Sequence, residues 1–235
     1  MLDKTSELNV KAATKQAKRA TAELVEKEKL RVEKVSITPP KFEYVYQKIR
    51  GTAPLMSNAM SSEARRKMRE GQEQGTQNRA MRRKRDPKNF EAQFKGSLHI
   101  STDGWYGMPC SAFRAAMIEA CKTIGYPMTR AKLFQFIEPD GRDRDTGEGL
   151  VRIEGKPIQD ERIGKLASGV ADILTRARFD EWSATVKIKW DSDALQPTDV
   201  VNLLARAGVH VGVGAGRPGS KNSCGIGMGT YELVE

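Results

Sequence analysis

The segment that most constrains the fold is EWSATVKIKWD, residues 181–191, because apolar and polar side chains alternate along it without interruption. The apolar members are Trp182, Ala184, Val186, Ile188 and Trp190. The polar members are Ser183, Thr185, Lys187 and Lys189. Successive side chains of a β-strand point to opposite faces, so this pattern predicts a strand with one face in a core and the other in solvent. Such a strand requires a second layer of structure that covers its apolar face.

Other segments predict the rest of that core. Alternating apolar residues predict strands over residues 42–50, 133–138 and 228–234, besides the strand over 181–190. Helical spacing predicts helices over 110–124, ended by Gly125, and over 197–207, begun by Pro197 and ended by Gly208. The resulting order is βαββαβ. We therefore predict an α+β fold with a ferredoxin-like, RRM-like core.

Two segments fall outside this core pattern. Residues 1–36 are rich in Ala, Lys and Glu, which predicts a helical N-terminal arm before a domain that covers residues 37–235. Residues 51–96, the basic insertion, follow the first strand. Within them, residues 63–85 hold nine Lys and Arg against three Glu, a local excess of six. The basic charge is therefore concentrated in one segment.

The whole chain of 235 residues carries a formal charge of +10. Such an excess favours an anionic partner, nucleic acid before membrane, because no lipid-binding pattern accompanies it. The N-terminus lacks the apolar stretch of a secretion signal, and no apolar run is long enough for a membrane helix. Three widely spaced cysteines without a CxxC pair indicate neither a disulfide framework nor a zinc site. We expect a soluble protein of a reducing cytoplasm.

A glycine-rich segment, residues 212–229 and here the glycine loop, contains the pattern G-x-G-x-x-G at Gly214, Gly216 and Gly219. In a dinucleotide site this pattern opens a helix, but SKNSCGIGMG follows here and only 16 residues remain after Gly219. A P-loop is also excluded, because the order is Gly-Ser-Lys. The segment is then either a long turn or a phosphate contact made by backbone amides. The residues for the second interpretation are Gly212, Gly214, Gly216, Arg217 and Lys221.

Further candidate contacts lie on other segments. Lys187 and Lys189, with Arg176 and Arg178 upstream, form either a basic track along a sheet or an ordinary solvated face. Trp105 and Tyr106 could stack on bases, although core packing is the alternative for at least one of them.

The sequence favours no enzyme. His99 and His210 lack a paired nucleophile and the spacing of metal ligands. The acidic turn with Asp140, Asp143, Asp145 and Glu148 lacks the register of a calcium loop, so we expect a solvated hairpin turn. No cofactor and no metal site are predicted.

Five motifs in order resemble a family of uncharacterised bacteriophage proteins over residues 83–235. They are DGWYGMPCSAFRAAMIEAC, MTRAKLFQF, EWSATVKIKWD, VVNLLARAG and GVGAGRPGSKNS. In that family an acidic residue is common where this chain has Ala215. At fold level the chain also resembles the RAMP-superfamily backbone subunits of CRISPR effector complexes. The RAMP resemblance implies that the glycine loop helps to hold RNA, that the basic insertion is thumb-like, and that protomers form head-to-tail filaments.

From these observations we hypothesise a phage protein, in the cytoplasm of the infected bacterium, that binds single-stranded nucleic acid through its phosphates, with RNA favoured. The insertion would clamp phosphates with Arg65, Arg66, Lys67, Arg69, Arg82, Arg83, Lys84 and Arg85. Lys48 and Arg50 would lie at the base of this clamp, and the glycine loop would grip the strand. Two alternatives remain open: coating of single-stranded DNA in phage recombination or replication, and a structural or host-interaction role without nucleic acid. A metal-dependent nuclease ranks last.

Overall fold

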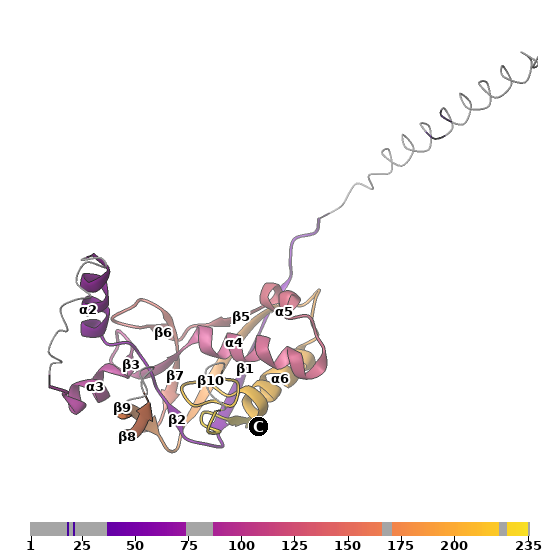
Figure 1. The fold of residues 1–235 in the computed structure, drawn as a ribbon. Helices are drawn as coiled ribbons and strands as arrows, with labels where there is room; N and C mark the ends of the chain where they lie inside the picture. Colours follow the sequence, from indigo (N-terminus) through magenta and orange to yellow (C-terminus); the bar gives the residue numbers. More distant parts are fainter. Residues whose placement is uncertain are drawn as a thin grey trace, which may run out of the picture. The chain divides into compact units, whose positions relative to one another are not determined.

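The structure is a computed structural model that describes residues 18, 21, 37–73, 87–165, 171–220 and 225–234. The chain divides into two compact units, Met1–Pro39 and Pro40–Glu235. The predicted helical arm lies outside the described residues except for Lys18 and Thr21, which are both helical. The second unit is an α+β fold with antiparallel sheets (Figure 1).

The larger sheet of this unit is built around β10. Four strands run in the order β11-β1-β10-β5, and every neighbouring pair is antiparallel. They are β1 (Phe42–Gly51), β5 (Gln135–Glu138), β10 (Ser183–Asp191) and β11 (Tyr231–Leu233). The start of β10 also pairs with β7, which extends the sheet through short strands. These are β3 (His99–Ile100), β4 (Tyr106–Pro109), β6 (Gly141–Arg142) and β7 (Gly149–Glu154).

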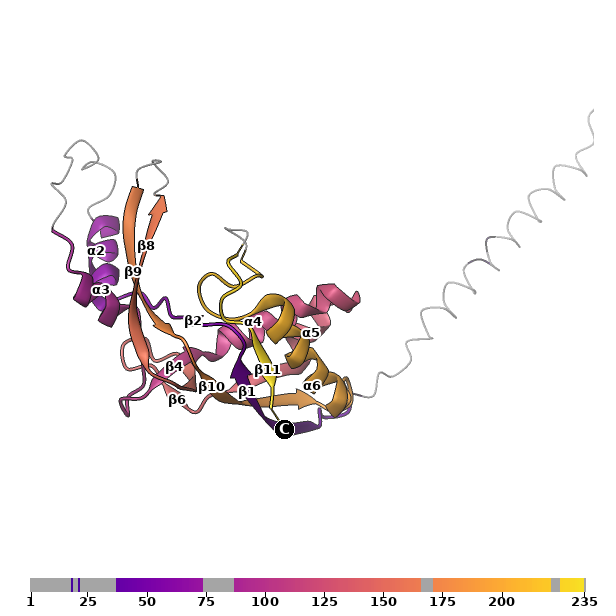
Figure 2. The same cartoon turned by 90° about the horizontal axis from the view of Figure 1, so that it is seen from below.

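Three helices cover one face of this sheet (Figure 2). They are α4 (Cys110–Ala120), continued by the 3₁₀ turn η2 (Cys121–Ile124), α5 (Met128–Phe134) and α6 (Pro197–Arg206). Phe113 and Met117 of α4 and Leu204 of α6 are fully buried against β10, where Val186 and Ile188 are also fully buried. Gly125 ends η2 with a φ of 67°, as predicted.

The alternation predicted for residues 181–191 is confirmed. Its five apolar members are at most 4% exposed, while the polar members are exposed or half-buried. In β1, the register across from β10 places Val45 opposite Ile188 and Ile49 opposite Ala184. Val45 and Ile49 therefore share the covered face, and the aromatic residues of β1 fall on the other face.

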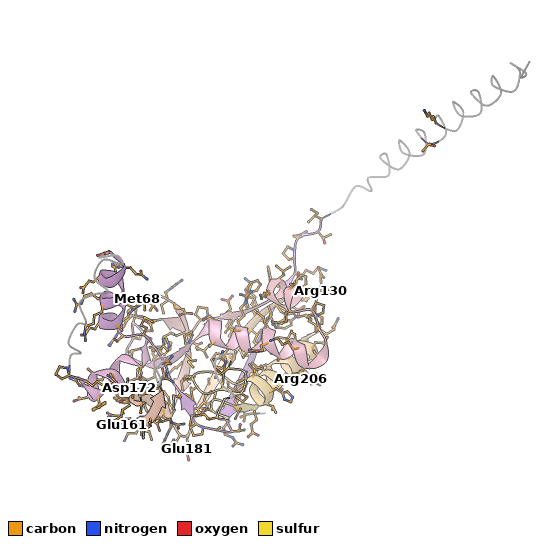
Figure 3. All side chains as sticks on the ribbon, viewed as in Figure 1. Met68, Arg130, Glu161, Asp172, Glu181 and Arg206 are labelled. Carbon is orange, nitrogen blue, oxygen red and sulfur yellow. The ribbon has the colours of Figure 1, made fainter. Side chains whose placement is uncertain are left out.

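The described part of the basic insertion contains β2 (Leu55–Met56), α2 (Ser62–Glu73) and α3 (Phe90–Gly96). β2 joins a second sheet in the order β2-β9-β8, with β8 (Pro157–Lys165) and β9 (Ala171–Phe179). Ser97, directly after the insertion, links it to this sheet, because the Ser97 hydroxyl accepts a hydrogen bond from the Ala177 amide over 2.8 Å. Lys88, just before α3, bonds to Asp172 of β9. Asp172 is labelled in Figure 3.

Three predicted boundaries were wrong. Residues 133 and 134 belong to α5, and the strand begins at Gln135. Arg114 donates hydrogen bonds to the carbonyl of Lys132, in the last turn of α5, and to that of Gln135. The helix at 197 does not end at Gly208 but continues as a π-helical turn, η3 (Ala207–Val211). A Cβ at Gly208 would lie 2.2 Å from the Tyr231 carbonyl oxygen, so this glycine permits close packing against β11. The last strand begins at Tyr231 because Gly227 and Gly229 have positive φ.

Candidate nucleic-acid interface

One face of the larger sheet is covered by α4, α5 and α6, and the other, here the open face, carries a row of aromatic and cationic side chains. Alternate residues of β1 lie on it in the order Phe42, Tyr44, Tyr46, Lys48 and Arg50. Phe42, Tyr44 and Tyr46 are 42%, 49% and 64% exposed. Opposite them, β10 contributes Lys187 across from Tyr46 and Lys189 across from Tyr44.

The two lysines of β10 alternate with the aromatic rings of β1. The Lys189 ammonium lies 4.5 Å from the centre of the Phe42 ring and 5.8 Å from that of Tyr44. The Lys187 ammonium lies 5.3 Å from the Tyr44 ring centre and 5.4 Å from that of Tyr46. Each lysine is thus within cation–π distance of two successive rings.

Carboxylates lie at the edges of the open face. Arg50 is bonded to Glu232 of β11 over 2.6 Å, and Glu138 of β5 lies opposite Lys187. The pKa of Lys187 is raised above its usual value, first by its hydrogen bond with Tyr46 and further by Glu138. Lys187 therefore stays charged at neutral pH. Among the described residues, Lys48 and Lys189 have no carboxylate within ion-pair distance.

The predicted cations of the insertion lie elsewhere, on α2, a helix with no buried residue. Arg66 pairs with Glu70 over 2.7 Å and Lys67 pairs with Glu63 over 3.0 Å, both along the helix. Arg65 reaches Asp145 at 4.0 Å. Arg69 is exposed, with no ion pair to any described residue. Arg82, Arg83, Lys84 and Arg85 lie outside the described residues.

A groove of about 1140 Å³ separates α2 and α3 from the turn at residues 143–148. Its lining carries charges of both signs, because Lys67 pairs with Glu63 and Lys88 with Asp172. The groove therefore presents less uncompensated charge than the open face does.

The glycine loop uses several of its backbone amides internally. The amides of Gly212, Val213 and Ala215 donate to the carbonyls of Ala207, Gly229 and Met56 respectively. The φ values of Gly212, Gly214 and Gly216 are 69°, 77° and 75°. This left-handed backbone conformation explains why glycine stands at these three positions.

Arg217 is also engaged inside the loop. Its guanidinium donates to the Gly214 carbonyl over 3.1 Å. Residues 212–220 form turns without a helix, in agreement with the exclusion of a dinucleotide site. Lys221 lies outside the described residues.

The structure thus brings Lys48 and Arg50 together with Lys187 and Lys189 on the open face, and leaves the described candidates of α2 and of the glycine loop apart from them. α2 and the glycine loop occupy separate regions in both views (Figures 1 and 2). Sequence reasoning missed Phe42, Tyr44 and Tyr46 as site residues. A signal was present, because these residues share the even positions of β1 with Lys48 and Arg50, whereas Val45 and Ile49 take the odd ones.

The proposed basic track does not form on one sheet. Arg176 and Arg178 lie on β9, in the smaller sheet, whereas Lys187 and Lys189 lie on β10. Arg178 is paired with Asp160 and Asp180. Burial, followed by the charge of Arg162, lowers the pKa of Arg176.

The two aromatic candidates of the DGWYG segment are half-buried and pack against neighbouring residues. The Tyr106 ring meets the Phe179 ring edge-on, with 6.0 Å between centroids. Trp105 lies against Gly107 and Gly141, and a Cβ at Gly141 would come within 2.6 Å of it. Core packing therefore applies to Tyr106, which packs against the buried cluster, whereas Trp105 lies outside that cluster.

The acidic turn is organised by Asp143, which is 5% exposed. One of its carboxylate oxygens accepts hydrogen bonds from the amides of Asp145 and Thr146, both over 2.9 Å, and the other lies 3.3 Å from His99 Nδ1. Burial alone would raise the pKa of Asp143, but these contacts outweigh it and lower the pKa. Within the described ranges, His, Cys, Asp and Glu form no cluster of three suited to a metal ion.

No protein-family model matches the chain. A search of curated proteins also finds no match. Among solved structures, the chain is similar to one chain of the cryo-EM structure of the Type III-B Cmr-beta bound to cognate target RNA. The TM-score is 0.40 and 10% of residues are identical; the match covers 97% of this chain and 65% of the other, so this chain spans about two thirds of that protein. In the described part of the chain no helix is long and apolar enough to cross a membrane.

Proposed function

We propose that this protein binds single-stranded nucleic acid, RNA favoured, mainly through its phosphate backbone. The observation that carries the proposal is the open face, where Lys48, Arg50, Lys187 and Lys189 lie on two adjacent strands, and no described element covers them. Regularly spaced cations on an exposed surface are the usual means by which proteins follow a phosphate backbone.

The ion pairs around these cations do not prevent them from binding phosphates. Arg50 is 67% exposed and Glu232 is 48% exposed, and such surface pairs contribute about 0 to 1 kcal/mol. An arginine can bind a phosphate in a bidentate, charge-assisted manner, which is stronger than a neutral hydrogen bond. A phosphate can therefore replace the carboxylate at little cost. The same reasoning applies to Arg66 and Lys67 of α2, whose partners are also exposed.

We further propose that the core is ferredoxin-like and that the protein belongs with the phage proteins and RAMP-type subunits that its motifs resemble. The strand order β11-β1-β10-β5 supports this, because strands 1 to 4 of the split βαβ plan would then lie in the order 4-1-3-2. The insertion between β1 and α4 and the glycine loop before β11 occupy the expected positions in the chain. In this proposal the protein assembles as a head-to-tail homo-oligomer or filament on the strand.

The test is the affinity for a labelled single-stranded oligonucleotide, measured by fluorescence polarisation at several salt concentrations. If about five phosphates are neutralised, the logarithm of affinity should fall with that of salt at a slope near −3.5. Lys48→Ala should make the slope about 0.7 shallower, and Leu133→Ala, an exposed position on α5, serves as the control. A slope near zero would contradict the proposal.

The same assay compares RNA with DNA of the same sequence, and electron microscopy with and without RNA shows whether filaments form. Equal affinity for the RNA and for the DNA would favour the DNA-coating alternative. Purified protein that assembles without any bound nucleic acid would favour the structural role.

A further inference from the structure

We infer that Tyr44 and Tyr46, with Phe42 beside them, form a base-stacking site. This inference rests on the proposed function and adds to it that bases, as well as phosphates, contact the open face. The three rings are contiguous on one strand, all more than two fifths exposed, and bordered by cations on both β1 and β10. A contiguous exposed apolar patch with a charged border is typical of a binding surface, whereas single exposed apolar residues need no explanation.

The lysines explain how the face is stable without a ligand. In the free protein, Lys187 and Lys189 lie near the ring faces, at 4.5 to 5.8 Å from the centroids. A cation–π contact at an exposed site is weak, and stacking of a base on an aromatic ring is stronger. A base can therefore take the place of a lysine, which then turns its ammonium to the adjacent phosphate. The site would thus lose one weak cation–π contact and gain two contacts, a base stacked on the ring and a phosphate beside the lysine.

The spacing of the rings determines which strands can bind. Rings at alternate residues of a strand lie about 7 Å apart, since each residue rises about 3.3 to 3.4 Å. Neighbouring bases in a stacked helix are separated by about 3.4 Å. Consecutive bases can thus occupy consecutive rings only if they are unstacked from each other. This requirement favours an extended single strand and disfavours a duplex.

The side chains on this face also permit a selective test. Tyr44 and Tyr46 are on the open face and contribute nothing to the buried cluster, so their truncation should leave the fold intact. Tyr44→Phe and Tyr46→Phe keep the ring and remove the hydroxyl. Leu133→Ala again removes an exposed apolar side chain, on α5 and away from the open face.

The experiment measures the binding of a labelled RNA 12-mer and of a matched strand of abasic sites, which keeps the phosphates and lacks the bases. Tyr44→Ala/Tyr46→Ala should weaken binding of the RNA by roughly 5- to 100-fold, and the double Phe variant by less than about 2-fold. The wild-type protein should bind the abasic strand more weakly than it binds RNA. The Ala variant and the wild type should have about the same affinity for the abasic strand. Circular dichroism verifies that each variant is folded.

Three results would overturn the inference, and they differ in what they imply for the proposed function. If wild type binds neither strand at low salt, both the proposed function and the stacking site are wrong. If the Ala variant binds RNA like wild type, the stacking site alone is wrong. If the Ala variant loses affinity for RNA and for the abasic strand equally, the rings do not contact bases.

Discussion

Arg50 on β1 and Glu232 on β11 form an ion pair across the open face, with 2.6 Å between Nη2 and Oε1. The carboxylate neutralises one of the four cations proposed to contact phosphates. Glu232→Gln should therefore raise the affinity for single-stranded RNA by about 2- to 5-fold, because both partners are exposed and such pairs are weak. If Arg50 gains a phosphate contact, the slope of log affinity against log salt should become steeper by about 0.7.

Glu161→Gln is the matched control for this substitution. Glu161 is exposed on β8, in the smaller sheet, and its replacement changes the net charge by the same amount. An equal gain in affinity for both variants would show that net charge, rather than the open face, governs binding.

Gly214→Ala should lower the free energy of unfolding by about 2 to 4 kcal/mol. Gly214 has a φ of 77°, and an added Cβ would lie 2.5 Å from the Met56 carbonyl oxygen, so backbone strain and overpacking both contribute. Chemical denaturation measures the change. Gly71→Ala in α2 is the control, because a Cβ there meets nothing within 4 Å and alanine favours a helix. It should leave stability unchanged or raise it slightly.

Arg217→Ala separates two roles of the glycine loop. Loss of the hydrogen bond to the Gly214 carbonyl should lower stability by about 0.5 to 1.5 kcal/mol. If Arg217 also contacts a phosphate, the affinity for RNA should fall several-fold and the salt slope should become shallower by about 0.7. Unfolding and polarisation measurements on the same preparation distinguish these effects. Reduced stability with unchanged affinity and slope would assign Arg217 to loop structure alone.

Asp143 should make the fold sensitive to acid. Its pKa in the folded state is lowered, so its contribution to stability is fully present above the unfolded pKa of about 3.9 and is lost as the pH falls through the folded pKa. Asp143→Asn keeps an oxygen acceptor for the amides of Asp145 and Thr146 but removes the charge. We expect a loss of about 1 kcal/mol at pH 7 that shrinks below pH 4. A loss that stays constant from pH 7 to pH 3 would argue against this origin.

Much of the larger sheet could be predicted from local pattern. The alternation in residues 181–191 fixed which side chains of β10 are buried, because a half-buried strand has only two faces. The helix begun by Pro197 and the stop at Gly125 followed from local backbone preferences. By contrast, Gly208 was expected to end a helix, and its true role depends on a contact with Tyr231, 23 positions further along the chain.

The candidate site was less predictable, since exposure and pairing depend on distant neighbours. The sequence shows that Arg178 is positively charged, but only the pairing of β8 with β9 brings Asp160 within ion-pair distance of it. The glycine loop contains many amides, and only folding directs several of them to carbonyls of β2 and neighbouring segments.

The sequence by itself determined the two strands that carry the open face, their alternation and their charge. Only the tertiary structure decided that Phe42, Tyr44 and Tyr46 lie outside the core. The helices can cover just one face of the sheet, and pairing with β10 assigns that face to Val45 and Ile49. A shift of one residue in this pairing would bury the aromatic rings and expose the aliphatic residues. Register, which is set between strands more than 130 residues apart, is therefore what exposes these rings.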